Sequence, residues 1–112
     1  MIIPRLLRWL NPQRMLALGR RVGPNAEWLI TPDLRLTRRQ VFDRVDRLSA
    51  GLQSLGVQRG DRVVALLPAC PESVFSIFLP WQLGTVEVQL NPLLREHELR
   101  PILTHCQANV VL

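Results

Sequence analysis

Residues 55–68 read Leu55-Gly56-Val57-Gln58-Arg59-Gly60-Asp61-Arg62-Val63-Val64-Ala65-Leu66-Leu67-Pro68. This order predicts the end of a helix at the first glycine, a tight turn at Gly60-Asp61 and a strand that begins at Arg62. The run from 62 to 67 is apolar without alternation, which is typical of a strand covered on both faces. A helix followed by such a strand, repeated along the chain, indicates a parallel sheet layered with helices.

The helix that ends at this stretch has a well-marked beginning. Thr37 at the N-cap and Gln40 three residues later form a capping box. An apolar stripe follows at alternating steps of four and three, made by Val41, Val45, Leu48, Leu52 and Leu55. This spacing predicts one buried face. Gly51 lies beside the stripe, where a missing side chain would let the helix approach a sheet closely.

A short helix and a hairpin are expected ahead of it. Asn11-Pro12 suits a helix start, because asparagine can cap free amides and proline fits the first helical position. Two short strands, 27–31 and 34–36, then flank Pro32-Asp33, which suits a type I turn. The early part of the chain therefore adds a β-hairpin to the predicted architecture.

Downstream, the alternation of helix and strand continues. Pro71 opens a helix that is apolar almost all round, and Pro80 inside it predicts a kink between residues 76 and 80. The remaining expected elements are a strand over 85–90, a helix over 96–104 and a strand from 109 onward. The fold class is therefore α/β, a partial parallel sheet layered with helices and preceded by a short β-hairpin.

Composition narrows the chemistry. The hydrophobic content of 47% fits a globular protein, and no stretch of about 20 apolar residues is present to span a membrane. The basic residues are all arginine, which excludes a lysine-dependent step within this chain. Cys70 and Cys106 lack metal or disulfide spacing and are expected to be reduced thiols. His97 and His105 are expected at the surface rather than as metal ligands.

Several motifs in this order and spacing resemble a known family. They are Leu36-Thr37, Leu55-Gly56-Val57, Gly60-Asp61-Arg62-Val63, the run from Leu66 to Glu72, Leu83-Gly84 and Leu90-Asn91-Pro92. Together they resemble the opening of the AMP-forming adenylating enzymes, the AMP-dependent synthetases and ligases that include acyl-CoA synthetases. The resemblance divides the chain into a basic leader segment, 1–11, and a truncated N-terminal AMP-binding-enzyme domain, 12–112.

The resemblance implies a reaction for the complete enzyme. A carboxylic acid, ATP and CoA would give acyl-CoA, AMP and pyrophosphate through an acyl adenylate, with Mg²⁺ required. Leu93-Leu94-Arg95-Glu96 with Ile102-Leu103 looks most like the CoA ligases of fatty or carnitine-type acids. The family's phosphate loop, adenine-stacking motif, ribose aspartate and C-terminal lysine are missing from this chain. No catalytic, cofactor-binding or metal residue is therefore carried over, and the chain alone is expected to be inactive and to bind none of these cofactors.

A few residues depart from the family pattern near the expected cleft. Ala69 replaces an asparagine, Thr85 an alanine and Gln89 a proline, while Glu87 adds a charge to a strand that is usually apolar. Open α/β sheets bind ligands at the carboxyl ends of their strands. The segments 68–70, which include Cys70, and Asn91-Pro92 are therefore expected near a binding cleft, without a chemical duty.

The N-terminal part of the chain accounts for the net charge. Residues 1–26 contain five arginines and no acidic residue, so they carry the whole formal charge of +5. One hypothesis is an interfacial anchor with an anionic membrane, made by Arg5, Leu6, Leu7, Arg8, Trp9 and Leu10. An arm docked on the domain, or a mitochondrial presequence, would fit the same residues. Nucleic-acid binding is not expected, because no known module accompanies the arginines.

Two functional hypotheses follow. In the first, the chain is the front of a cytoplasmic acyl-CoA synthetase that works at the membrane periphery. In the second, it is a non-catalytic truncated product that acts as an interaction or membrane-surface module.

Overall fold

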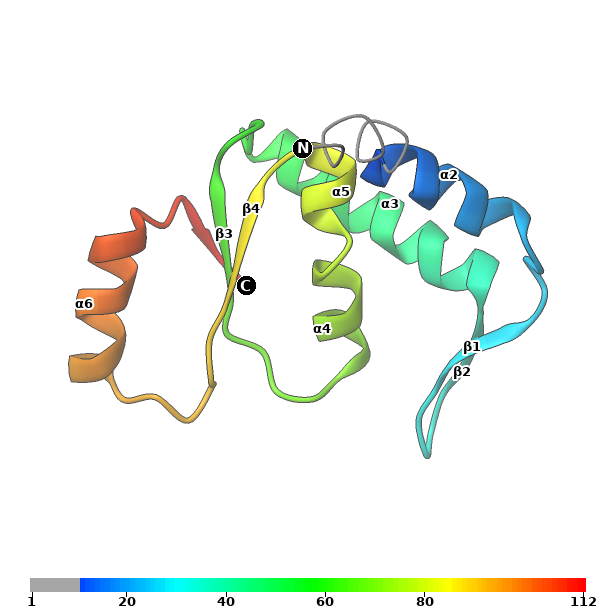
Figure 1. The fold of residues 1–112 in the computed structure, drawn as a ribbon. Helices are drawn as coiled ribbons and strands as arrows, with labels where there is room; N and C mark the ends of the chain where they lie inside the picture. The colour runs from blue at the N-terminus through cyan, green and yellow to red at the C-terminus, as the bar shows by residue number, and fades with distance from the viewer. Residues whose placement is uncertain (1–10) are drawn as a thin grey trace, which may run out of the picture. The chain divides into compact units, whose positions relative to one another are not determined.

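The computed structural model describes residues 11–112, so the predicted anchor at residues 5–10 lies outside the described residues. The chain divides into two compact units, 1–43 and 44–112. Each unit is described by itself below, with the elements labelled in Figure 1. Within residues 11–112, no helix combines the length and the apolar character needed to cross a membrane.

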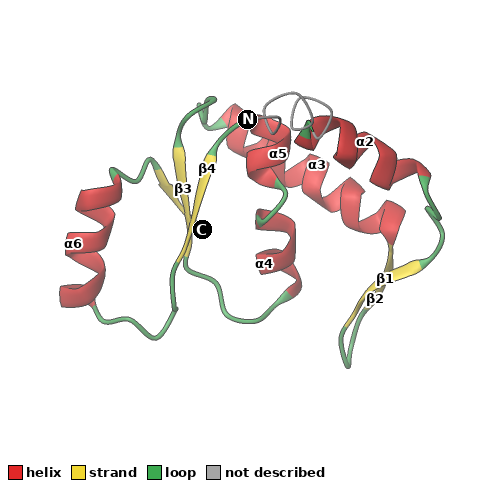
Figure 2. Ribbon diagram, viewed as in Figure 1, coloured by secondary structure: helices red, strands yellow, loops and turns green. Residues whose placement is uncertain are grey.

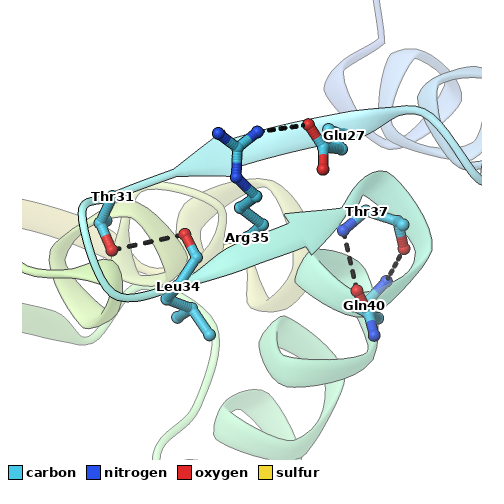
Figure 3. A network of polar contacts seen from close by, with 6 residues as sticks. All are labelled: Glu27, Thr31, Leu34, Arg35, Thr37 and Gln40. Carbon is cyan, nitrogen blue, oxygen red and sulfur yellow. Dashed lines mark hydrogen bonds and ion pairs between the residues drawn. The ribbon is translucent and has the colours of Figure 1, made fainter.

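The first unit contains α2 (Pro12–Arg21), the hairpin strands β1 (Glu27–Ile30) and β2 (Arg35–Thr37), and the start of α3 (Arg38–Ser54). Asn11 caps α2 as predicted, because its Oδ1 accepts a hydrogen bond from the Gln13 amide at 2.9 Å. The two strands are antiparallel, and across the turn the Thr31 amide donates to the Leu34 carbonyl at 2.8 Å. An ion pair of 2.9 Å between Arg35 and Glu27 joins the strands on their exposed side (Figure 3).

The capping box at the start of α3 is confirmed. The Thr37 amide donates to Gln40 Oε1 at 2.9 Å, and the Gln40 amide donates to Thr37 Oγ1 at 3.3 Å (Figure 3). Two orphan amides of the helix start are thereby satisfied by local side chains, which explains why the sequence alone located this boundary.

Two aromatic rings and two guanidinium groups contact one another in the first unit. Phe42 is buried, and its ring centroid lies 5.3 Å from that of Trp28. Arg20 lies 4.8 Å above the Phe42 ring, and Arg38 lies 5.3 Å above the Trp28 ring. Guanidinium groups over aromatic faces are attracted by the ring quadrupole. Arg38 also donates from Nη1 to the Val22 carbonyl, which ties α3 to the end of α2.

The second unit is a three-stranded parallel sheet with helices, as predicted. The strands are β3 (Arg62–Ala65), β4 (Val86–Gln89) and β5 (Val110–Val111), in the spatial order β4-β3-β5. Val63 of the central strand pairs with Glu87 on one side and Val110 on the other. Val63 and Val64 point to opposite faces and are both fully buried, so the central strand is covered on both sides.

The helices of this unit cover the two faces of the sheet. Figure 2 shows α6 (Glu96–Cys106) on one face, and α4 (Pro71–Ser76) and α5 (Leu79–Leu83) on the other. Leu52 from α3 and Leu79 from α5 form the core cluster with Val57 and Val63. This placement follows from right-handed crossovers, because β3 to β4 and β4 to β5 run in opposite directions across the sheet.

Asn109 joins β5 to the central strand, β3, through two hydrogen bonds. The Arg62 amide donates to Asn109 Oδ1 at 2.8 Å, and the Asn109 amide donates to the Arg62 carbonyl at 2.9 Å. One side chain thus sets the register of β5 against β3.

Two expectations for α3 are wrong. Leu55 was placed on the buried stripe but is 79% exposed, because the helix ends at Ser54 and the helical period no longer applies. Gly56 has φ of 91° there, and the Val57 amide donates to the Leu52 carbonyl at 3.0 Å, which turns Val57 into the core. Gly51 is exposed, and a Cβ there would meet nothing within 4 Å, so it permits no close approach to the sheet.

The expected kink near Pro80 is a complete break. α4 ends at Ser76, and α5 begins at Leu79 with Pro80 in its first turn. Pro80 has no amide hydrogen to donate to the Ser76 carbonyl four residues earlier, so the hydrogen bond that would continue the helix is missing and two short helices replace one long one. The break also leaves Ile77 and Trp81 partly exposed, although a helix apolar all round was expected to be packed on several sides.

Candidate functional site

A pocket of about 210 Å³ lies at the carboxyl ends of β3 and β4. Its lining includes Pro68 and Ala69 from the loop after β3, together with Gln89 and Leu90 at the end of β4. The remaining lining residues are Ala65, Leu67, Ser73 and Ile77. Of the segments expected near a cleft, residues 68–69 are in this wall, whereas Cys70, Asn91 and Pro92 are not.

The polar groups around this pocket are held by hydrogen bonds. Ser73 Oγ donates to the Cys70 carbonyl at 2.7 Å. Glu87 Oε1 accepts from Ser76 Oγ at 2.7 Å and from Gln89 Nε2 at 3.4 Å. Ser76 is fully buried, so the Glu87 carboxylate is anchored inside the unit behind the pocket wall. Among residues 11–112, those that line the pocket are uncharged, which suits a neutral or apolar occupant.

Gln89, Ser73 and Ile77 were not predicted as lining residues. The sequence singled out Gln89 only because it replaces a proline of the family pattern. Its position follows from register, because Gln89 pairs with Ala65 of β3 and so reaches the same edge as the loop at 68–69. Pairing between strands that lie more than twenty residues apart leaves no local mark in the sequence.

A second pocket, of about 390 Å³, opens on the other side of the β3 end. Its floor is apolar, with Leu48, Leu67, Phe75 and Leu112. Arg44 and Arg47 from α3 and Glu72 from α4 line its rim. The sequence did not predict this pocket, because its lining residues lie far apart in the chain, from Arg44 to Leu112.

Two of the glycines with positive φ, Gly56 and Gly60, lie in turns. The Gly56 amide donates to the Gln53 carbonyl and the Gly60 amide to the Gly84 carbonyl, each at 2.9 Å. The Asp61 amide donates to the Gln58 carbonyl at 3.1 Å. A phosphate nest requires free amides that point at the anion, and these amides are already engaged. The interpretation of Gly60-Asp61 as a turn that directs the strand is therefore confirmed.

The titratable side chains are dispersed. Among residues 11–112, no three or more His, Cys, Asp or Glu side chains gather in a way that could hold a metal ion. His97 and His105 are both exposed on α6, as expected. Cys70 and Cys106 are free thiols, each half-buried.

Comparison with known proteins assigns the family. The AMP-binding enzyme family matches residues 19–112. The chain belongs to this family. Its relatives are acyl-CoA ligases and related acid ligases, and its structural neighbours include the N-terminal domains of adenylating enzymes.

Two relatives show how much sequence this chain shares with other AMP-binding enzymes. The chain is 40% identical to a long-chain-fatty-acid–CoA ligase of Bacillus subtilis over 78 residues, which is 70% of this chain and 14% of that protein. It is 34% identical to 4-coumarate–CoA ligase 1 of Solanum tuberosum over 77 residues, 69% of this chain and 13% of that protein. The chain thus spans only about a seventh of the length of these relatives.

Solved structures of the family share the fold. A fatty acyl CoA synthetase of Mycobacterium tuberculosis matches with a TM-score of 0.83 and 30% identity, over 90% of this chain and 20% of that one. An anthranilate CoA ligase matches with a TM-score of 0.81 and 35% identity, over 90% of this chain and 20% of that one. The fold predicted from the sequence, a parallel sheet at the start of an adenylating enzyme, is confirmed.

Proposed function

We propose that this chain is the N-terminal part of an ATP-dependent acyl-CoA synthetase. The complete enzyme would join a carboxylic acid to AMP with release of pyrophosphate, and would then transfer the acyl group to the CoA thiol with release of AMP. The observation that carries this proposal is the family match over residues 19–112, together with relatives that are themselves named CoA ligases.

The proposed acid is a fatty or carnitine-type acid. The 40% identity to a long-chain-fatty-acid–CoA ligase and the structural match to a fatty acyl CoA synthetase support this choice. The uncharged lining of the pocket at the ends of β3 and β4 is compatible with an apolar group nearby. Aromatic-acid ligases among the relatives make a hydroxycinnamate or benzoate the comparison substrate in any test.

The proposed cofactors of the complete enzyme are ATP, Mg²⁺ and CoA, and we assign none of them to this chain alone. The amides of Gly56, Gly60 and Asp61 are engaged in backbone bonds, and the described residues offer no group of three metal ligands. Residues 11–112 therefore act as scaffold, and activity of the isolated chain is not expected.

The proposed location is cytoplasmic, at the membrane periphery. Arg5, Leu6, Leu7, Arg8, Trp9 and Leu10 would contact anionic head groups weakly. The arginines and the neighbouring apolar residues in this short segment support that contact.

The first test is to read the gene sequence that follows the codon for Leu112. An open frame with a glycine-rich loop that ends in lysine supports the ligase, whereas a stop codon supports the rival proposal of a non-catalytic module. The product of an open frame is then assayed for AMP release with ATP, CoA and octanoate, hexadecanoate or carnitine, with 4-coumarate and benzoate as the comparison acids. The 112-residue chain is the matched control. Release of AMP by that control would refute its inactivity, and a complete product inactive on every acid would refute the ligase.

A further inference from the structure

The helix α2 turns only one of its faces toward its own unit. Leu16 is the buried residue of α2, and Arg20 lies over the Phe42 ring. A Cβ at Gly19 would lie 3.8 Å from Phe42, so this glycine also faces the interior. Positions 16, 19 and 20 therefore define the inner face of the helix.

A second face of α2 is apolar but exposed. We call Met15, Leu18 and Val22 the α2 stripe. These side chains are 47%, 63% and 55% exposed. Met15 and Leu18 are three residues apart in α2 and therefore lie on the same side of the helix, and Val22 follows its last residue, Arg21, in an extended conformation. A short helix in a folded unit would ordinarily bury such side chains, so the α2 stripe is suited to a contact outside the unit.

The charged residues next to the α2 stripe in the sequence are all positive. Arg14 and Arg21 are exposed on the same helix, next to Met15 and Val22 in sequence. No acidic residue occurs between residues 11 and 26, and Glu27, the first in the sequence, is paired with Arg35 at 2.9 Å. The charged residues of α2 are thus all positive, and no carboxylate on this helix neutralises them.

We propose that α2 is an interfacial helix that binds an anionic lipid surface. The α2 stripe would enter the boundary between head groups and acyl chains, while the Arg14 and Arg21 guanidinium groups bind lipid phosphates. Ten residues give a helix about 15 Å long, which lies in the plane of the interface and does not cross it. A nucleic acid would engage the arginines, but the exposed aliphatic side chains would contribute nothing to that contact.

This inference depends on residues of α2 alone. It requires neither acid activation by a complete enzyme nor the contact proposed for residues 5–10. A failure of either proposal leaves the prediction for α2 unchanged, so the outcomes can be told apart.

The experiment is co-sedimentation of the 112-residue chain with lipid vesicles. Vesicles that contain phosphatidylglycerol are compared with vesicles of phosphatidylcholine alone, at low and at high salt. We expect binding to the anionic vesicles only, with a loss of binding at high salt because the Debye length shortens.

The double variant Met15→Gln/Leu18→Gln should bind about tenfold more weakly, because its apolar area no longer enters the interface. Arg14→Gln and Arg21→Gln should each weaken binding about fivefold.

Matched controls come from the same chain. Leu55→Gln alters a leucine that is 79% exposed in the second unit, and its binding should equal that of the unaltered chain. Deletion of residues 1–10 should leave the effect of the double variant intact. Circular dichroism checks that each variant retains its helical content.

Two results would overturn the inference. One is equal binding of the double variant and the unaltered chain to anionic vesicles. The other is retention by a DNA duplex with no retention by vesicles, which would assign the arginines to phosphate backbones.

Discussion

Gly51 and Gly56 lie near the end of the same helix but in different backbone conformations. Gly51 is inside α3, where a Cβ would meet nothing within 4 Å, whereas Gly56 has φ of 91° just past the helix. We expect Gly51→Ala to raise the free energy of unfolding by about 1 kcal/mol, because alanine loses less backbone entropy in a helix. Gly56→Ala should lower it by at least about 1 kcal/mol, because the Cβ is strained at positive φ. Urea unfolding of both variants checks the pair, and effects of the same sign would contradict it.

Thr85 presents a hydroxyl that the structure leaves without a partner. The residue is 6% exposed, and its Oγ1 atom is buried with no hydrogen bond. Valine has the same shape without the hydroxyl, so Thr85→Val should raise the free energy of unfolding by about 1 kcal/mol. Thr104→Val is the control, because Thr104 is exposed and its Oγ1 donates to the Arg100 carbonyl at 2.9 Å. A loss of stability in Thr85→Val would show that the hydroxyl is satisfied in solution.

At the scale of elements, a single hydroxyl joins α4 to β4. Ser76 Oγ donates to Glu87 Oε1 at 2.7 Å and also lies 2.9 Å from the Ser73 carbonyl. We expect Ser76→Ala to lower the free energy of unfolding by about 1–3 kcal/mol, because the half-buried Glu87 carboxylate loses its short hydrogen bond. Thermal and urea unfolding measure the change.

Ser54→Ala is the matched control for the hydrogen bond between Ser76 and Glu87. Its hydroxyl is exposed and donates to the Gly51 carbonyl at 2.6 Å within one helix, so the effect should stay within about 0.5 kcal/mol. Equal effects of the two substitutions would show that the α4–β4 contact adds nothing.

Elements with local signals were predictable, and those set by distant contacts were not. The capping box at Thr37 and the helix end at Gly56 each depend on a few adjacent residues, so the sequence located both. Leu55 fits the helical period, but the left-handed turn after Ser54 ends that period and buries Val57 in its place. Gln89 lies in the wall of one pocket because it pairs with Ala65, and Arg44 and Arg47 line the other pocket together with residues far away in the sequence, such as Leu112. Neither contact has a signature in the linear order of residues.

At the scale of the whole molecule, the three-stranded sheet ends in two open edges within the described residues. β4 is one of them, and its first residue, Val86, is 48% exposed. An exposed edge strand is a template for pairing with another chain, because its backbone amides and carbonyls on that side are unpaired within the sheet. We expect Val86→Lys to reduce self-association of the 112-residue chain, because a charge on the edge opposes strand pairing. Static light scattering over a range of concentrations measures this.

Leu93→Lys provides the comparison for the edge. Leu93 is 84% exposed but lies in the loop after β4, outside the strand. The same added charge there should reduce self-association less. If both substitutions act equally, net charge rather than the strand edge governs the association.

The reciprocal bonds between Asn109 and Arg62 also set an order of events during synthesis on the ribosome. β3 and β4 are separated by one short crossover, so they can pair as soon as the residues up to 89 have emerged. Asn109, whose side chain accepts the hydrogen bond from the Arg62 amide, lies 47 residues later in the sequence. Forming this bond must therefore close a loop of that length, which costs conformational entropy. We therefore expect nascent chains halted before residue 109 to form an intermediate in which only β3 and β4 are paired. The other edge of β3 would be accessible to chaperones until Asn109 is present and β5 pairs there.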